Sequence, residues 1–312
     1  MLSDRSAVRV IADFGADYLV DDGASSWRAQ AKRCDPAVGD WVNLDGGFIT
    51  EVLPRRTAFS RRASGAETRE QVLAANVDVA FVVAAAIDVN ERRLERYLTI
   101  AWQSGAEPVV VITKADLIDD VDVPQVAAPV IVTSAVTGQG IEEIRAELEP
   151  AKTGVLLGPS GVGKSSLINQ LSGADVMKTR EIHRSGEGRH MTSHRQLVRI
   201  PGGGMIIDTP GLREAQLWEG EDALSAVFED VEALALQCRF PDCAHDTEPG
   251  CAIKSAIASG GLDPERYASY RKLQRELRAV ALKSDARLRQ DERRKWRQIS
   301  VAMRARERYL RR

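Results

Sequence analysis

Short runs of apolar and β-prone residues, separated by turn residues, occupy the first part of the chain. The runs read AVRVIADF, DYLV, SSWRAQ, DWVNL and GFITEVL, with Gly, Asp and Pro between them. Several short strands bounded by such turn signals are typical of a small barrel or sandwich. We therefore expect an all-β domain over residues 1–62.

The middle of the chain, residues 63–218, has a different pattern. Continuous apolar runs predict strands that are buried on both faces. These runs are NVDVAFVVAAA, PVVVIT, APVIVTSA, TGVLLG and GMIIDT. Between them, residues 90–102 have helical spacing, and residues 140–150 read as a short helix that Pro150 ends. Alternating strands and helices predict a parallel sheet with helices on both faces, that is, an α/β domain.

From residue 219 to 312 the pattern is helical. ALSAVFEDVEALALQ reads as one amphipathic helix. Another helix begins with Asp263 as its cap and Pro264 at its first position, which are residues that favour helix starts. Beyond residue 283 the sequence is mostly charged with sparse apolar residues, so we expect this stretch to be helical only when bound, or disordered.

Charge is distributed unevenly over the 312 residues, although the net charge is only −2. Residues 265–312 hold 17 Lys and Arg against 6 Asp and Glu, so the rest of the chain is acidic. This asymmetry favours a polyanionic partner, nucleic acid before membrane; a solvated charged helix is the alternative. No apolar run reaches the ~18 residues of a membrane helix, and the N-terminus lacks a signal-peptide core. We expect a cytoplasmic protein that does not contact membranes.

One stretch, GPSGVGKS at residues 158–165, matches the phosphate-binding pattern G-x-x-x-x-G-K-S. Its glycines allow backbone amides to turn toward phosphate oxygens, and the following helix adds partial positive charge. Lys164 would neutralise the β- and γ-phosphates, and the Ser165 hydroxyl is a hard ligand for Mg²⁺. A chance glycine-rich turn is the alternative, but a predicted strand precedes the stretch and a helix follows it. The predicted phosphate-binding residues are Gly158, Pro159, Ser160, Gly161, Val162, Gly163, Lys164, Ser165 and Ser166.

The motif DTPG at residues 208–211 follows the last predicted strand of the α/β domain. Asp208 at this place would hold Mg²⁺ through water, and the amide of Gly211 would sense the γ-phosphate. Alone, D-x-x-G is often a plain turn. Its position one strand and one loop after the phosphate-binding stretch favours the functional interpretation.

Two loops are candidates for binding a guanine base. Residues 113–116 read TKAD, and an ionised Asp116 can accept hydrogen bonds from both adjacent donors of guanine, a pair that adenine lacks. The stem of Lys114 would lie across the base, and the amide of Ala135 would meet guanine O6. Thr113 stands where Asn is usual, which predicts a looser contact between this loop and the phosphate loop. The predicted base-binding residues are Thr113, Lys114, Ala115, Asp116, Ser134 and Ala135.

Three cysteines and one histidine cluster late in the chain, as Cys238-x4-Cys243-x-His245-x5-Cys251. Three thiolates and one imidazole form a closed tetrahedral set for zinc. We expect one structural zinc ion per chain that stabilises this segment. Disulfides are unusual in the cytosol. The alternative to a metal site is therefore a group of unpaired buried cysteines. Cys34, far from the cluster, is expected to be an ordinary residue.

The base-reading motif precedes the phosphate-reading motif, which is a circular permutation of the common order in GTP-binding proteins. Loops that follow parallel strands meet at one edge of the sheet, so the permuted motifs still converge. This order, the β domain in front and the Cys/His cluster behind resemble the ribosome small-subunit-dependent GTPase A family, also called RsgA or YjeQ. The resemblance extends to about residue 280. It implies an OB-fold, a permuted P-loop GTPase domain and a zinc-binding helical domain, with a role in late maturation of the bacterial 30S subunit and hydrolysis stimulated by that subunit.

The same resemblance assigns roles between the phosphate loop and DTPG. Aligning the family's pattern with Gly188-Arg189-His190-Met191-Thr192 makes Thr192 a Mg²⁺ ligand and His190 the catalytic group. Leu212 stands where many small GTPases have a water-orienting Gln, so another side chain must act, and imidazole is suited to it. His190 could instead contact RNA or cap its loop. His194 and His183 are weaker candidates.

Three functions are compatible with these motifs. The leading one is a GTPase acting on the 30S subunit, with 16S rRNA, GTP and GDP as ligands and a monomeric chain. A P-loop ATPase or small-molecule kinase would make both base loops coincidental. A nucleotide-gated RNA-binding scaffold with negligible turnover is the third, because Leu212 and Met191 depart from the usual residues.

Overall fold

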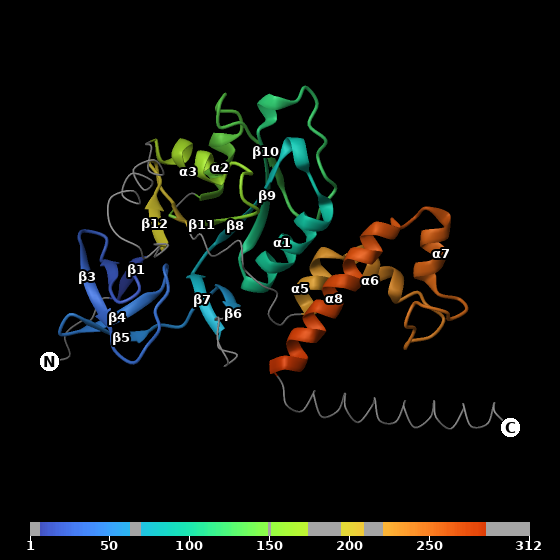
Figure 1. The fold of residues 1–312 in the computed structure, drawn as a ribbon, viewed down its shortest axis with the longest axis horizontal. Helices are drawn as coiled ribbons and strands as arrows, with labels where there is room; N and C mark the ends of the chain where they lie inside the picture. Colours follow the sequence, from blue (N-terminus) through green and yellow to red (C-terminus); the bar gives the residue numbers. More distant parts are fainter. Residues whose placement is uncertain (1–6, 63–69, 149–150, 174–194, 209–220, 285–312) are drawn as a thin grey trace.

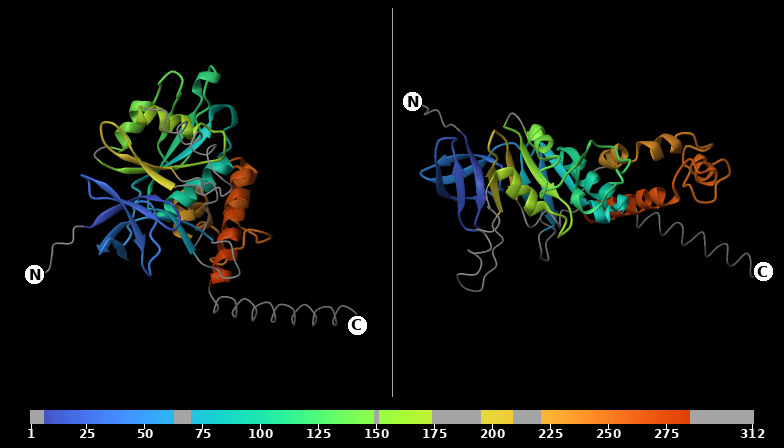
Figure 2. Two further views of the ribbon diagram at one scale, coloured as in Figure 1. Left: turned by 60° about the vertical axis from the view of Figure 1, so that its left-hand side comes forward. Right: turned by 90° about the horizontal axis from the view of Figure 1, so that it is seen from above.

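The computed structural model describes residues 7–62, 70–148, 151–173, 195–208 and 221–284. Within them, eleven strands form one mixed sheet in the order β10-β9-β8-β11-β13-β12-β1-β2-β3-β5-β4 (Figure 1). The N-terminal strands, the α/β part and the C-terminal helices follow one another along the molecule, as the right-hand view of Figure 2 shows. In the described part of the chain, no helix is both long enough and apolar enough to span a bilayer.

The α/β part contains a parallel sheet, as the apolar runs predict. Strand β8 pairs with β9 and β11, β9 also pairs with β10, and β11 also pairs with β13, all in parallel. Its strands are β8 (Val79–Ala85), β9 (Glu107–Thr113), β10 (Val130–Val132), β11 (Thr153–Leu157) and β13 (Met205–Asp208).

Helices cover both faces of this sheet. Alternate residues of each strand point to opposite sides and therefore pack against different helices. On β8, Val82 packs with the core that includes α1 (Glu91–Ser104), and Val83 packs with the core of α2 (Ile141–Leu148) and α3 (Lys164–Ser172). Both faces are buried, which explains why these strands read as continuous apolar runs.

The N-terminal strands form a small β-barrel, because β1 pairs with both β2 and β4 and so closes the curled sheet. Its strands are β1 (Val8–Asp13), β2 (Tyr18–Asp21), β3 (Ser26–Ala31), β4 (Trp41–Asp45) and β5 (Phe48–Val52). Val10, Val20, Val42 and Ile49, each with no exposed surface, lie in its core.

Strand β12 (Arg195–Arg199), which the sequence pattern did not predict, joins the barrel to the α/β part. It pairs antiparallel with both β13 and β1, so one sheet continues from the α/β part into the barrel. The hairpin of β6 (Ala58–Arg62) and β7 (Glu70–Ala75) extends across residue 62, the boundary expected between the two domains.

The C-terminal part is helical, but the prediction of a single helix over residues 223–237 is wrong. There are two helices, α5 (Glu221–Val227) and α6 (Glu229–Ala235), which are separated at Phe228. The backbone of Phe228 (φ −118°, ψ 40°) leaves the helical region and its fully buried ring packs edge-on against Tyr270. A buried aromatic contact therefore outweighs the continuous helical periodicity.

Helix α8 (Pro264–Ser284) begins as predicted, with the Asp263 carboxylate accepting a hydrogen bond from the Glu265 amide at 2.9 Å. A further helix, α7 (Ala252–Ser259), was not predicted. The basic residues from 285 onward lie outside the described residues.

Arg266 of α8 ties the C-terminal helices to α1. Its guanidinium donates to Glu95 Oε1 at 2.7 Å and to both carboxylate oxygens of Asp230 at 2.7 Å. It also lies over the Phe228 ring, 4.9 Å from the centroid. Burial raises the pKa of Glu95, and the bond to Asp230 raises the pKa of Arg266. The Arg266–Glu95 ion pair is therefore largely desolvated, and losing one partner should lower the stability of the fold strongly.

Replacing Arg266 by Met is expected to lower the free energy of unfolding by about 3–5 kcal/mol, because the Glu95 carboxylate, 4% exposed, loses its cation. Urea unfolding followed by circular dichroism measures this. Arg92→Met is the matched control, since the Arg92–Glu265 pair is 52% and 73% exposed and should contribute less than about 1 kcal/mol. Equal losses in the two variants would contradict this account.

Candidate nucleotide-binding and metal sites

The phosphate-binding stretch connects the end of β11 to the start of α3. Gly158 (φ +144°) has no room for a side chain, since a Cβ there would lie 2.4 Å from the Val83 carbonyl oxygen. Gly163 (φ +99°) precedes the first helical residue in the left-handed conformation. These two positions require glycine, which explains the spacing of the motif.

Lys164 is the first residue of α3, and its ammonium lies over the loop that precedes it. The Nζ atom donates to the carbonyl oxygens of Gly158 at 2.8 Å and Pro159 at 2.5 Å. Ser165 and Ser166 are exposed in the first helical turn. A cation, exposed hydroxyl groups and a helix N-terminus thus gather at one place, an arrangement that suits a phosphorylated ligand.

The two candidate base loops are bonded to each other. The fully buried hydroxyl of Ser134 donates to Asp116 Oδ1 at 2.5 Å, and it accepts the amides of Val136 and Thr137 at 3.1 Å. The Ala115 amide donates to the Thr133 carbonyl oxygen at 3.1 Å. Ser134 therefore orients the exposed Asp116 carboxylate, which is a role the residue pattern alone does not reveal.

Thr113 links the base loop to the phosphate loop. Its hydroxyl, on a residue that is 3% exposed, lies within hydrogen-bond distance of the carbonyl oxygens of Val162 and Ala84. We expected a looser contact between the base loop and the phosphate loop at this position, but the structure contains a direct one. The Thr113 side chain, at the end of β9, is long enough for its hydroxyl to reach the Val162 carbonyl oxygen.

Replacing Thr113 by Val removes this hydroxyl at nearly constant volume. We expect nucleotide binding to weaken by about 3- to 15-fold, the effect of losing one buried hydrogen bond of about 1 kcal/mol or slightly more. Titration of a fluorescent GDP analogue measures the dissociation constant. Thr113→Ser, which keeps the hydroxyl, should retain most of the affinity. Wild-type affinity in Thr113→Val would show that the contact does not position the loops.

The parallel strands bring these loops to one edge of the sheet. Thr113 ends β9, Gly158 follows β11, and Asp208 ends β13, whose Ile207 is opposite Val155 of β11. Residues from both sides of the permuted order therefore lie along the same edge, as the sequence predicts.

Several predicted residues cannot be placed in this way. His190, Thr192 and Gly211 lie outside the described residues, as do the alternatives His183 and His194. Their roles remain predictions.

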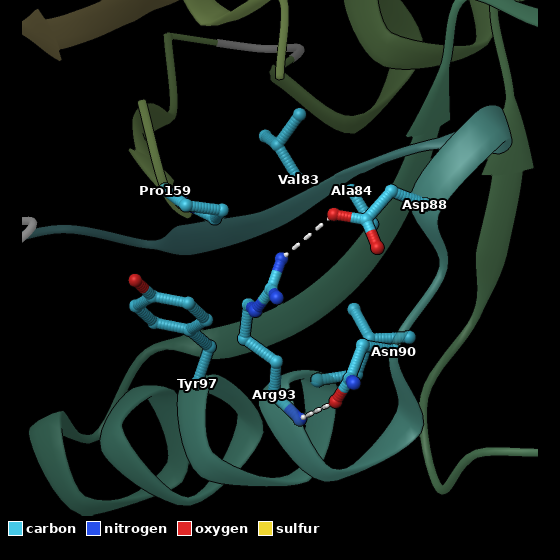
Figure 3. A pocket seen from close by; sticks show the side chains of 8 residues that line it. Val83, Ala84, Asp88, Asn90, Arg93, Tyr97 and Pro159 are labelled. Carbon is cyan, nitrogen blue, oxygen red and sulfur yellow. Dashed lines mark hydrogen bonds and ion pairs between the residues drawn. The ribbon is translucent and has the colours of Figure 1, made fainter. Parts of the chain in front are cut away.

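A small pocket next to the phosphate loop was not predicted from the sequence (Figure 3). It is a shallow space between the end of β8, the first turns of α1 and Pro159, and it is partly open to solvent. Two of its polar side chains, Arg93 and Asp88, form an ion pair at 3.2 Å, and the Asn90 side chain accepts a hydrogen bond from the Arg93 backbone amide at 3.0 Å. At this pocket, α1 lies next to the phosphate loop. The same helix also contacts the C-terminal helices α5 and α8.

The Cys/His cluster forms one compact group of ligand atoms. The sulfur and nitrogen atoms of Cys238, Cys243, His245 and Cys251 all lie within 4.8 Å of one another. Nδ1 of His245 is 3.5 Å from the sulfurs of Cys238 and Cys251, which are 4.0 Å apart. Tetrahedral zinc, with Zn–S of about 2.3 Å and Zn–N of about 2.0 Å, has ligand separations of ~3.5–3.8 Å, which the two 3.5 Å separations match and the 4.0 Å separation approaches. The cluster therefore fits a metal ion of this type.

The fold and the loops together define a P-loop GTPase whose motifs run in circularly permuted order, with a β-barrel before it and a metal-ligand cluster after it. The sequence model of the RsgA GTPase family matches residues 52–218. The small ribosomal subunit biogenesis GTPase RsgA of Opitutus terrae is 48% identical, over 88% of this chain and 81% of its own length. The chain belongs to the RsgA GTPase family, as its resemblance predicts.

Solved structures agree with this assignment. The crystal structure of YjeQ from Thermotoga maritima is similar with a TM-score of 0.65 and 28% identity, over 87% of this chain and 98% of that one. YloQ, described as a circularly permuted GTPase, has a TM-score of 0.61 and 24% identity, over 88% of this chain and 95% of that one, which shows the shared fold.

Proposed function

We propose that this chain hydrolyses GTP and acts in late maturation of the small ribosomal subunit. The observation that carries the proposal is the convergence of the Asp116 loop and the phosphate loop at one sheet edge, where Thr113 links them. The relatives named as small ribosomal subunit biogenesis GTPases support the biological role.

In this proposal the two ends of the nucleotide have separate binding groups. Asp116 accepts the two donors of guanine, the Ala135 amide donates to O6, and the stem of Lys114 covers the base. The backbone amides of residues 160–166 and the Lys164 ammonium hold the phosphates. Ser165 and Thr192 would hold the Mg²⁺ ion that accompanies GTP, with Asp208 acting through water, and the ion would supply neutralisation of phosphate charge.

Catalysis requires a group that orients the attacking water. We assign this to His190, because Leu212 carries no polar atom, and we assign the sensing of the γ-phosphate to Gly211. The Cys238, Cys243, His245 and Cys251 cluster holds one structural zinc ion per chain. These residues stabilise the segment between α6 and α7 and take no part in hydrolysis.

Binding to the subunit would use its 16S rRNA. The barrel, proposed as an OB-fold over residues 1–62, and the basic C-terminal residues are the proposed contacts, with the GTPase domain over residues 63–218 and the helical domain from 219. Electrostatic binding of this kind weakens steeply with salt. We propose a monomeric cytoplasmic protein whose release from the subunit is coupled to hydrolysis.

Phosphate release from GTP and from ATP, with and without purified small subunits, tests the proposal in the wild type and in His190→Ala. We expect turnover of GTP alone, strong stimulation by subunits, and loss of that stimulation in the variant. Turnover of ATP would indicate the ATPase or kinase alternative. Subunit binding without turnover would favour the RNA-binding scaffold. Stimulated turnover that survives in His190→Ala would remove the catalytic assignment alone.

A further inference from the structure

Gln170, on the phosphate-binding helix α3, reaches the second base loop. Its side-chain amide donates to the Ala135 carbonyl oxygen at 2.5 Å, across 35 residues of sequence. Gln170 lies six residues after Lys164, on the exposed side of a helix whose neighbouring Leu167 and Leu171 are fully buried. The helix that begins at the phosphate site is thus bonded directly to the loop that faces the base.

The backbone of Gln170 is itself held in place. The guanidinium of Arg145, on α2, donates to the Gln170 carbonyl oxygen at 3.4 Å and to the Pro201 carbonyl oxygen at 2.9 Å. Helices α2 and α3 pack on the same face of the sheet, in the core that contains Ile144 and Leu167. The backbone that carries the Gln170 side chain is therefore held in a defined position.

The bonded carbonyl belongs to the peptide that follows the Ala135 amide. That amide is the group expected to meet guanine O6. On its other side, Ser134 is fixed by its bond to Asp116 and by its own amide, which donates to the Gln139 carbonyl oxygen at 3.0 Å. With Ser134 held before it and Gln170 holding the carbonyl after it, the Ala135 amide has little freedom to rotate away.

We propose that Gln170 is a positioning residue for guanine recognition, which fixes the Ala135 amide relative to the phosphate-binding helix. The inference rests on the proposed function, since it assumes that guanine occupies this edge. Adenine presents an amino donor in place of O6, so a rigid Ala135 amide would also disfavour adenine nucleotides. The hydrogen bond between Gln170 and Ala135 thus fixes the distance between the phosphate site and the base site. In this way it contributes to the selectivity for guanine nucleotides.

Gln170→Glu is the direct test, because glutamate has nearly the same size but cannot donate to a carbonyl oxygen. Gln125→Glu is the matched control. It introduces the same charge on an exposed residue of the loop that precedes β10, outside both base loops. Thermal unfolding of all three full-length proteins establishes that they are folded.

The readout is the dissociation constant for three nucleotides. GDP and inosine diphosphate carry O6, whereas the diphosphate of 2-aminopurine riboside lacks it. We expect Gln170→Glu to weaken GDP and inosine diphosphate by about 3- to 10-fold, the effect of one lost hydrogen bond, and the 2-aminopurine nucleotide less than about twofold. Gln125→Glu should change none of the three by more than about twofold.

Two results would overturn the inference: unchanged GDP binding in Gln170→Glu, or equal weakening of all three nucleotides, which would indicate a merely structural role. The proposed function is judged separately by the wild type. If the wild type binds ADP as well as GDP, guanine recognition fails and the role of Gln170 fails with it. A wild-type preference for GDP with an unaffected variant would remove the Gln170 inference alone.

Discussion

Asp116→Asn is expected to weaken GTP binding on the order of 10²- to 10⁴-fold. A charged acceptor that bonds two guanine donors becomes an amide with one acceptor and one donor, and each hydrogen bond to a charged group contributes about 1.5–3 kcal/mol. Xanthine carries a carbonyl oxygen in place of the 2-amino group, so it offers one donor and one acceptor. Xanthosine triphosphate is therefore expected to bind the variant more tightly than GTP does.

The geometry around Asp116 sharpens this prediction. The Ser134 hydroxyl, which donates to Asp116 Oδ1, would favour the amide rotamer that keeps an oxygen at this position. Competition titrations with GTP and xanthosine triphosphate measure the exchange of preference. Asp119→Asn, an exposed residue three positions further along, should leave both affinities unchanged. Unaltered GTP binding in Asp116→Asn would show that the base occupies another place.

Features with a local sequence signature were predicted well. The strands of the parallel sheet follow from runs such as 76–86, because a strand buried on both faces needs apolar residues at every position. The phosphate loop follows from glycine spacing, since Gly158 and Gly163 adopt positive φ angles. The Asp263 cap also depends only on neighbouring residues.

Features that depend on distant residues were not predicted. Strand β12 is five residues long with polar ends, and it pairs not only with its neighbour β13 but also with β1, about 180 residues away. The break at Phe228 arises from its contact with Tyr270 on another helix. The bonds from Gln170 to Ala135 and from Arg266 to Glu95 connect helices and loops that no periodicity relates.

The Thr113 contact illustrates a related limit. The substitution of the usual asparagine suggested a weakened link, because residue type was judged without its distance to the phosphate loop. Thr113 ends a buried strand directly beside Val162, so a shorter side chain is sufficient. A departure from a motif therefore cannot be interpreted before the separation of the two loops is known.

Removing the proposed zinc ion is expected to unfold the segment between α6 and α7 while nucleotide binding persists. Cys251 is buried at the first turn of α7, and the Ala252 amide donates to the Cys238 sulfur at 3.3 Å, so the ligands themselves connect the ends of this segment. Binding of structural zinc in small peptides contributes about 10–16 kcal/mol at neutral pH, and all of it is lost on chelation.

Chelator titration followed by circular dichroism and by GDP affinity tests this separation, with Cys251→Ser as the matching variant. Both should lower the unfolding temperature of the C-terminal helices and leave the GDP dissociation constant within about twofold, because the phosphate-binding helix α3 packs in a core that contains none of the four ligands. Cys34→Ser is the control, since its sulfur lies in the barrel near the Ile49 carbonyl oxygen and far from the cluster. A chain indifferent to both chelator and Cys251→Ser would show that the four ligands hold no structural metal, and that the contacts of Phe228 and Tyr270 hold the C-terminal helices without it.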